Sequence, residues 1–179
     1  MRKKSLNLSL SSLIAALCTA IMMSTGLITI GTYALPAIAG IFCVPIVIEI
    51  NKKWAVATYV VTSLLSILIA ADKEAVIIFI LFFGYYPILK ATIEKIKNRW
   101  LVLFFKLFIF NISIIFYYVL TMNLLGLPDD AFALFGVSVP LFFLAMGNVT
   151  FLLYDYAVSK FIQIYIFKLQ PKVKKFLKL

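Results

Sequence analysis

Apolar residues fall into six long runs, separated by short polar or charged breaks. A helix rises 1.5 Å per residue, so about 20 mostly apolar residues cross a membrane. The runs predict spans over residues 9–29, 34–50, 54–71, 75–91, 101–125 and 135–158, of which the fourth is short for a full crossing. The breaks between them carry turn or charge signals, in "GTY", "NKK", "ADKE", "KATIEKIKNR" and "GLPDD". This pattern predicts an all-α integral membrane protein with six transmembrane helices in a single domain of 179 residues.

The composition supports a membrane protein and narrows the chemistry. The chain is 64% hydrophobic and only 13% charged, which is more apolar surface than a soluble domain of this size could bury. There is no histidine, and the two cysteines, Cys18 and Cys43, both lie within apolar runs. We therefore expect free buried thiols rather than a disulfide, and no metal site.

The basic residues predict the orientation of the six spans. Cytoplasmic loops of membrane proteins are enriched in lysine and arginine. With six spans, 15 of the 17 basic residues fall on one side: Arg2, Lys3, Lys4, Lys52, Lys53, Lys90, Lys95, Lys97, Arg99, Lys160, Lys168, Lys172, Lys174, Lys175 and Lys178. We therefore expect a plasma-membrane protein with both termini in the cytoplasm. The basic tail, residues 159–179, either follows this rule alone or also lies on anionic headgroups.

Motifs for several kinds of chemistry are absent from the sequence. The nearest approach to a phosphate-binding loop, from Gly26 to Gly31, is followed by Thr32 and lacks the required lysine. No zinc-protease helix motif and no nucleophile elbow occur. We expect no catalytic residues, no cofactor and no enzymatic activity of the chain itself. The net charge of +10 is explained by topology, so no nucleic-acid partner is expected.

Charged and amide side chains inside the predicted spans are costly in lipid and usually face protein or water. Lys106 and Asp155 lie at similar depths in the last two spans and are predicted to form a buried ion pair, with a proton relay as the alternative. Asn148 lies seven residues before Asp155 on the same helix face. For Asn148, as for Asn111 and Asn123, an interhelical hydrogen bond and a ligand contact both stay open.

Small residues recur every fourth position in the first span, at Ser12, Ala16, Ala20 and Ser24. Positions i and i+4 lie above one another on a helix, so these four form one face. Small side chains let another helix backbone approach closely in a membrane. The partner helix could belong to this chain or to another subunit.

The chain resembles the substrate-binding S components of energy-coupling factor (ECF) transporters in four features. These are six short spans, both termini inside, no ATPase motif and an Ala-x-x-x-Ala ladder in the first span. The segments "DKEAVIIFILFFGYYPILK" and "GNVTFLLYDYAV" are similar to those of uncharacterised bacterial proteins grouped with S components. The resemblance implies a vitamin-uptake subunit whose partners are a transmembrane coupling subunit and two ATPases. The coupling subunit would dock on Ser12, Ala16, Ala20 and Ser24.

The resemblance also implies a ligand site near the outer face, among the outer loops and the outer halves of the last helices. Mapped onto this chain, the implied substrate-binding residues are Asp72, Lys73, Glu74, Asn123, Asp129 and Asn148. Their mixed charges would suit a zwitterionic or cationic small molecule. Two other classes stay open, namely a proton-linked small transporter or channel coupled through Lys106 and Asp155, and a membrane assembly protein without a ligand.

Overall fold

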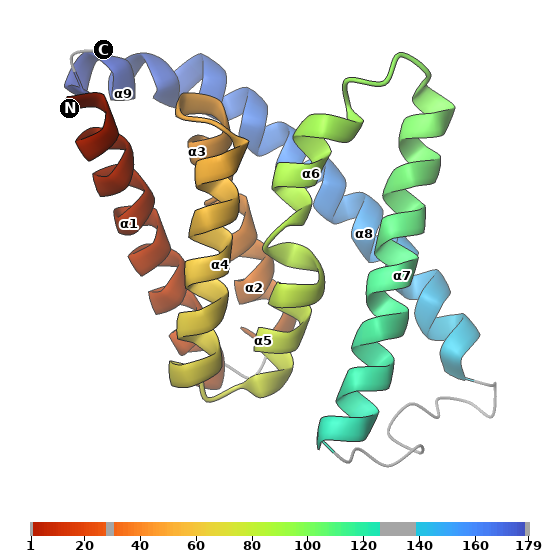
Figure 1. The fold of residues 1–179 in the computed structure, drawn as a ribbon. Coiled ribbons are helices and arrows are strands. Elements are labelled where there is room, and N and C mark those ends of the chain that lie inside the picture. The colour runs from red at the N-terminus through yellow and green to blue at the C-terminus, as the bar shows by residue number, and fades with distance from the viewer. Residues whose placement is uncertain (1, 28–30, 126–138, 178–179) are drawn as a thin grey trace.

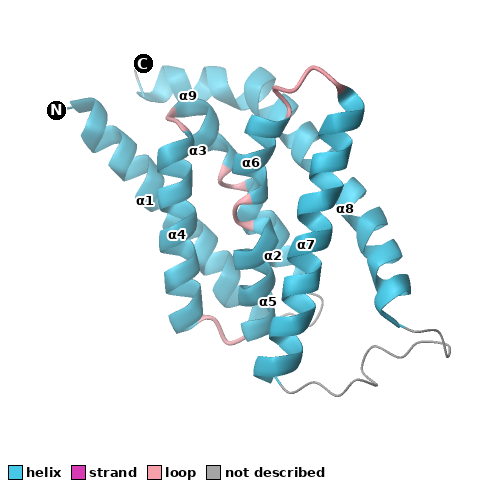
Figure 2. Ribbon diagram, turned by 45° about the vertical axis from the view of Figure 1, so that its right-hand side comes forward, coloured by secondary structure: helices cyan, strands magenta, loops and turns pink. Residues whose placement is uncertain are grey.

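The computed structural model describes residues 2–27, 31–125 and 139–177, and this part of the chain consists of helices joined by short turns and loops, without strands (Figures 1 and 2). The all-α prediction is therefore confirmed for the described residues. The elements follow one another along the chain as α1 (Arg2–Met23), the 3₁₀ turn η1 (Ser24–Leu27), α2 (Gly31–Ile41), α3 (Val44–Glu49), α4 (Lys52–Ile69), α5 (Lys73–Ile78), the π-helical turn η2 (Phe79–Phe83), α6 (Tyr86–Ile93), α7 (Arg99–Leu125), α8 (Val139–Ile164), the π-helical turn η4 (Tyr165–Leu169) and α9 (Gln170–Leu177).

Five helical segments of the described chain are long and apolar enough to cross a membrane: Lys4–Leu27, Gly31–Glu49, Lys52–Ile69, Lys73–Ile93 and Arg99–Thr121. Large apolar side chains such as Leu68 and Phe116 are exposed along these helices, which suits contact with lipid. The fold is thus compatible with a multi-pass membrane protein. The sixth predicted span begins outside the described residues, at 135–138, and its remainder lies in the 26-residue helix α8.

Polar side chains in the predicted breaks begin the helices that follow them. Asn51 accepts a hydrogen bond at its Oδ1 from the backbone nitrogen of Trp54, at 3.0 Å, and so caps the start of α4. Asp72 does the same for α5 through the backbone nitrogen of Ala75, also at 3.0 Å. The signals "NKK" and "ADKE" therefore mark true helix boundaries.

Two predicted spans are interrupted rather than continuous. The second consists of α2, with Pro36 inside it, and α3, joined by a turn at residues 42–43. The fourth consists of α5, η2 and α6, and a turn separates η2 from α6 at residues 84–85. It nevertheless extends over 21 residues, Lys73–Ile93, so the expectation that it is short for a crossing is wrong. The helical segment gains residues 73–74 before the predicted apolar run and 92–93 after it.

Gly40 explains why α2 and η2 can lie so close together. A Cβ atom on Gly40 would lie 2.1 Å from the carbonyl oxygen of Phe83 and 3.1 Å from the hydroxyl of Tyr154. No side chain fits in that space, so only glycine allows the π-helical turn to pack against α2 here.

The described residues form three buried apolar clusters, of which the third and smallest consists of Ile46, Ala55 and Ile88. The first joins α1, α2 and α5 and includes Cys18, Met22 and Phe79, with both cysteines of the chain buried as free thiols. The second is aromatic and joins η2, α6, α7 and α8 through Phe82, Tyr86, Phe110, Phe151 and Tyr154. Within it the rings of Phe110 and Phe151 stack with centroids 4.8 Å apart. The aromatic core is one of the contacts that hold α7 and α8 to the rest of the bundle.

The starts of α1 and α4 lie at the same end of the bundle as α9, which we call the basic end (Figure 1). The opposite end carries the connection between α4 and α5, with Asp72 and Glu74, and we call it the acidic end (Figures 1 and 2). The two ends hold the two main groups of polar side chains.

Candidate functional site

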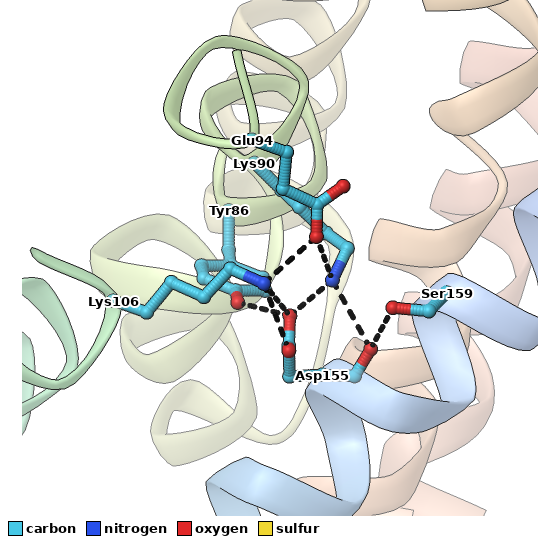
Figure 3. Close-up of polar contacts among 6 residues, drawn as sticks. All are labelled: Tyr86, Lys90, Glu94, Lys106, Asp155 and Ser159. Carbon is cyan, nitrogen blue, oxygen red and sulfur yellow. Dashed lines mark hydrogen bonds and ion pairs between the residues drawn. The ribbon is translucent and has the colours of Figure 1, made fainter. Parts of the chain in front are cut away.

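Four charged side chains from three helices meet near the basic end and form what we call the four-charge cluster (Figure 3). Its members are Lys90 on α6, Glu94 directly after the end of α6, Lys106 on α7 and Asp155 on α8. The Nζ of Lys106 lies 2.8 Å from Glu94 Oε1, and 3.0 and 2.9 Å from the two carboxylate oxygens of Asp155. Lys90 lies 2.8 Å from Glu94 Oε1 and also pairs with Asp155 Oδ1. Each lysine therefore contacts both carboxylates.

Burial and neutral donors complete this cluster. The side chain of Lys90 is fully buried and that of Lys106 nearly so, whereas Glu94 is partly open to solvent. The hydroxyl of Tyr86 donates to Asp155 Oδ1 at 2.5 Å. Two positive and two negative charges balance, which is the condition under which buried ions are tolerated. The arrangement cross-links three helices.

Glu94 follows the last residue of α6 and lies just outside the segment Lys73–Ile93. Burial alone would raise the pKa of its carboxyl group. Hydrogen bonds from Lys106 and Lys90, together with their charges, outweigh that effect and hold the pKa of Glu94 below its usual range. Glu94 is therefore a carboxylate at neutral pH, as the charge balance of the cluster requires.

The structure brings Lys106 and Asp155 together as the sequence predicts, but sequence reasoning missed the other half of the cluster. The sequence groups Lys90 with the basic residues of the cytoplasmic side, whereas the structure places it within α6 and fully buried. It therefore does not contribute to the loop charge bias. The spacing of Tyr86, Lys90 and Glu94, four residues apart on one helix face, is the signal that could have found them.

Polar side chains at the acidic end form a second group. Asp72 accepts a hydrogen bond at Oδ2 from the hydroxyl of Thr32 on α2, at 2.8 Å, in addition to capping α5. Lys73 turns toward the end of α4, where its ammonium donates to the carbonyl oxygens of Ile67 at 2.8 Å and Ala70 at 3.0 Å. These two adjacent residues thus have separate structural partners.

Glu74 is held by two tyrosines from different helices. Its Oε1 accepts hydrogen bonds from the hydroxyl of Tyr33 on α2, at 2.5 Å, and from that of Tyr117 on α7. The two tyrosine oxygens lie 3.1 Å apart. Tyr117 is buried, but Tyr33 has 45% of its surface exposed and Glu74 is half-buried. This group joins α2, α5 and α7 and stays accessible from outside the bundle.

The remaining predicted ligand residues do not join this group. Asn148 exchanges amide hydrogen bonds with Asn111 across α7 and α8, at 3.0 and 3.1 Å. This contact matches the interhelical interpretation, and a ligand contact of Asn148 stays a prediction. Asn123 is exposed and donates to the carbonyl oxygen of its own helix at Val119. Asp129 lies outside the described residues.

The small-residue face of α1 is free within the described bundle. Ser12, Ala16 and Ala20 are exposed and Ser24 is half-buried, whereas α1 packs on α2 and α4 with its opposite face. The hydroxyl of Ser12 donates to Ser9 O and that of Ser24 to Ala20 O, both at 3.0 Å. Because both hydroxyls bond within their own helix, the face presents no unsatisfied donor.

No group of three or more potential metal-ligating side chains occurs among the described residues. Comparison with known proteins finds no matching family model, no matching curated protein and no matching solved structure. The two polar groups and the free face of α1 are the described features that bear on function.

Proposed function

We propose that this chain is the substrate-binding membrane subunit of an ECF-type importer and captures a small vitamin-like molecule at the outer face. The observation that carries the proposal is the free face of α1, formed by Ser12, Ala16, Ala20 and Ser24. These small residues lie on the helix face that points away from α2 and α4. A row of small side chains has no packing role against lipid, so a helix of another subunit accounts for it best.

The proposed topology has six spans with both termini in the cytoplasm of a plasma-membrane protein. The basic end would face the cytoplasm, where lysine and arginine are enriched, and the acidic end would face outward. Helix α8 would be the sixth span. The Asp72–Glu74 segment at the start of α5 would then lie where an external substrate arrives.

The energy for uptake would come from partner subunits, a transmembrane coupling subunit and two ATPases, because this sequence has no ATP-binding motif. Docking in lipid depends on close van der Waals packing rather than on the hydrophobic effect. A bulky side chain at Ala16 or Ala20 would hold the partner helix away along the whole row. Docking and uptake should then fail together.

The four-charge cluster supports this proposal over a proton-linked transporter. A relay needs a group that changes its protonation during transport, whereas each carboxylate here is bonded to two lysines. Balanced and hydrogen-bonded charges suit a structural cross-link of α6, α7 and α8.

The proposal is tested with Ala20→Trp and the matched control Ala15→Trp. Ala15 is buried on the packed side of α1, whereas Ala20 is exposed on the free face. We expect Ala20→Trp to keep the thermal stability of the isolated chain but to lose co-purification with the ATPase subunits and ATP-dependent uptake. Ala15→Trp should lower the stability of the isolated chain, because overpacking costs about 1–3 kcal/mol.

Two outcomes would contradict the proposal. One is a wild-type chain that purifies from its native membranes without any ATPase. The other is a loss of stability in Ala20→Trp equal to that in Ala15→Trp, which would place the face inside the folded monomer. Mass spectrometry of small molecules bound to the purified chain separates a binding subunit from an assembly protein without a ligand.

A further inference from the structure

The carboxylates of the four-charge cluster and those of the acidic end differ in how their charge is compensated. In the ranges 2–27, 31–125 and 139–177, the ion pairs involve Glu94 and Asp155, both in the four-charge cluster. At the acidic end, Asp72 and Glu74 have no cation within ion-pair distance in those same ranges. A half-buried carboxylate without a counter-ion is costly near a membrane, unless a ligand supplies the charge.

Lys73 does not neutralise these carboxylates, although it lies between them in sequence. Its ammonium is bound to the carbonyl oxygens of Ile67 and Ala70. The last carbonyls of a helix carry partial negative charge, so the end of α4 holds the lysine there. The local field around Glu74 therefore remains negative.

The surroundings of Glu74 suit a positively charged organic group. Tyr33 and Tyr117 both donate to Oε1, whereas Oε2 receives no hydrogen bond from any described residue. An ammonium could therefore bond to Oε2 with two tyrosine rings nearby, and aromatic rings attract cations through their faces. A metal ion fits poorly, because Ca²⁺ and Mg²⁺ need several oxygen ligands.

A second observation on α7 supports a ligand at this place. Thr121 lies one helical turn beyond Tyr117 on the same face of α7. Its side chain is fully buried, yet its hydroxyl has no hydrogen-bond partner among the described residues. Five other buried hydroxyls of the described residues also lack a partner, so Thr121 is relevant here only because it shares a face of α7 with Tyr117, where a polar group on a bound ligand would satisfy it.

We infer that the substrate is a small organic cation, whose ammonium group binds Oε2 of Glu74 beside the rings of Tyr33 and Tyr117. The inference rests on the proposed function, since it assigns a substrate class to the proposed outward-facing site. Anions are disfavoured because Asp72 and Glu74 would repel them. The ammonium of Lys73 is already bound to carbonyl oxygens at the end of α4. It is therefore not free to pair with the carboxylate of a zwitterionic substrate.

The experiment uses three probes that share one ring and differ in charge: benzylammonium, benzyl alcohol and benzoate. Their affinities for the purified full chain are measured by calorimetry at pH 7. We expect benzylammonium to bind about tenfold or more tightly than either other probe, as a cation–π contact and a charged hydrogen bond imply. Glu74→Gln should remove this preference.

Glu49→Gln is the matched control for this substitution. Glu49 ends helix α3 and, like Glu74, accepts a hydrogen bond from a tyrosine, Tyr165, at 3.3 Å. It is not part of the group around Glu74, so its substitution should leave the preference for benzylammonium unchanged. If Glu74→Gln fails to fold, Tyr33→Leu takes its place, because loss of the half-exposed ring should weaken benzylammonium and spare benzyl alcohol.

Benzylammonium binding no tighter than benzyl alcohol, or a preference that survives in Glu74→Gln or Tyr33→Leu, would overturn the inference. This failure is distinct from failure of the proposed function. A chain that co-purifies with ATPases but shows no preference for the ammonium retains its transport role and loses the assigned substrate class. A chain that prefers the ammonium through Glu74 but binds no ATPase retains the site and loses the importer.

Discussion

The ammonium of Lys106 on α7 donates to both carboxylate oxygens of Asp155 on α8, at 3.0 and 2.9 Å. This contact is not an isolated pair, because both residues are also bonded within the four-charge cluster (Figure 3). Removing one member leaves a net charge on the other three. Removing one lysine and one carboxylate together leaves a balanced pair.

The first prediction follows from this charge balance. Asp155→Asn should lower the free energy of unfolding by about 3–5 kcal/mol, because Lys90 and Lys106 would then share one carboxylate in a buried place. The double variant Lys106→Met with Asp155→Asn leaves Lys90 paired with Glu94. Its loss in free energy of unfolding should therefore be smaller than the sum of the two single losses by at least about 1 kcal/mol. Denaturant unfolding in detergent micelles measures all three variants.

The control for this cycle is Lys160→Met, which removes an exposed lysine of the same helix α8. Its effect should stay within about 0.5 kcal/mol. Strict additivity of the Lys106 and Asp155 substitutions would show that the two residues do not act as partners.

The sequence predicted Lys106 and Asp155 because each is a charge well inside an apolar run, where it needs a partner. Lys90 escaped the same reasoning because it stands at the end of the fourth run, where lysine usually reaches water. The structure continues α6 to Ile93, so Lys90 lies a turn inside the helix. The predicted span 75–91 contains Lys90 near its end, where the sequence alone does not distinguish a buried lysine from one that reaches water.

Helix boundaries were predictable where a side chain caps the helix, as Asn51 and Asp72 do. The interruptions inside the second and fourth spans were not predicted, although each is followed by a helix with a proline in its first turn, Pro45 in α3 and Pro87 in α6. The close packing of the π-helical turn at Phe79–Phe83 against α2 depends on Gly40 in another helix. Periodicity along one segment contains no information about such a neighbour.

The second prediction concerns Gly40. Gly40→Ala should lower the free energy of unfolding by about 1–3 kcal/mol, because its Cβ would lie 2.1 Å from the backbone oxygen of Phe83 and the two helices would have to separate. The measurement is a denaturant titration of the purified chain.

Gly147→Ala on α8 is the matched control for Gly40→Ala. A Cβ on Gly147 would lie 3.4 Å from the ring of Phe110, which is an ordinary contact with a side chain. Alanine also favours a helix interior more than glycine does. Equal destabilisation by the two substitutions would contradict the close approach of α2 and η2.

The third prediction separates the two interpretations of Asn148. If the contact with Asn111 is structural, Asn148→Leu leaves an unsatisfied amide and destabilises the chain, whereas Asn111→Leu with Asn148→Leu recovers much of the loss. The coupling should be about 0.6 kcal/mol or more, measured by unfolding in detergent. A role in ligand binding would instead appear as weaker substrate binding with unchanged stability.

The fourth prediction tests the six-span topology by cysteine labelling. Ala71 lies exposed at the acidic end, between α4 and α5, and Ile96 lies exposed at the basic end, between α6 and α7. In intact cells an impermeant maleimide should label Ala71→Cys, and should label Ile96→Cys only after the membrane is permeabilised. The native thiols of Cys18 and Cys43 are buried and should give little background.

The tail decides whether α8 is the sixth span. With five spans the tail would be on the same side as Ala71, whereas with six it would be on the same side as Ile96. Lys172 in α9 is exposed, so Lys172→Cys reports the side directly. We expect it to stay unlabelled in intact cells and to react after permeabilisation. Labelling of Lys172→Cys together with Ala71→Cys in intact cells would remove the sixth span and place the basic tail outside the cell, against the tendency of lysine-rich segments to remain in the cytoplasm.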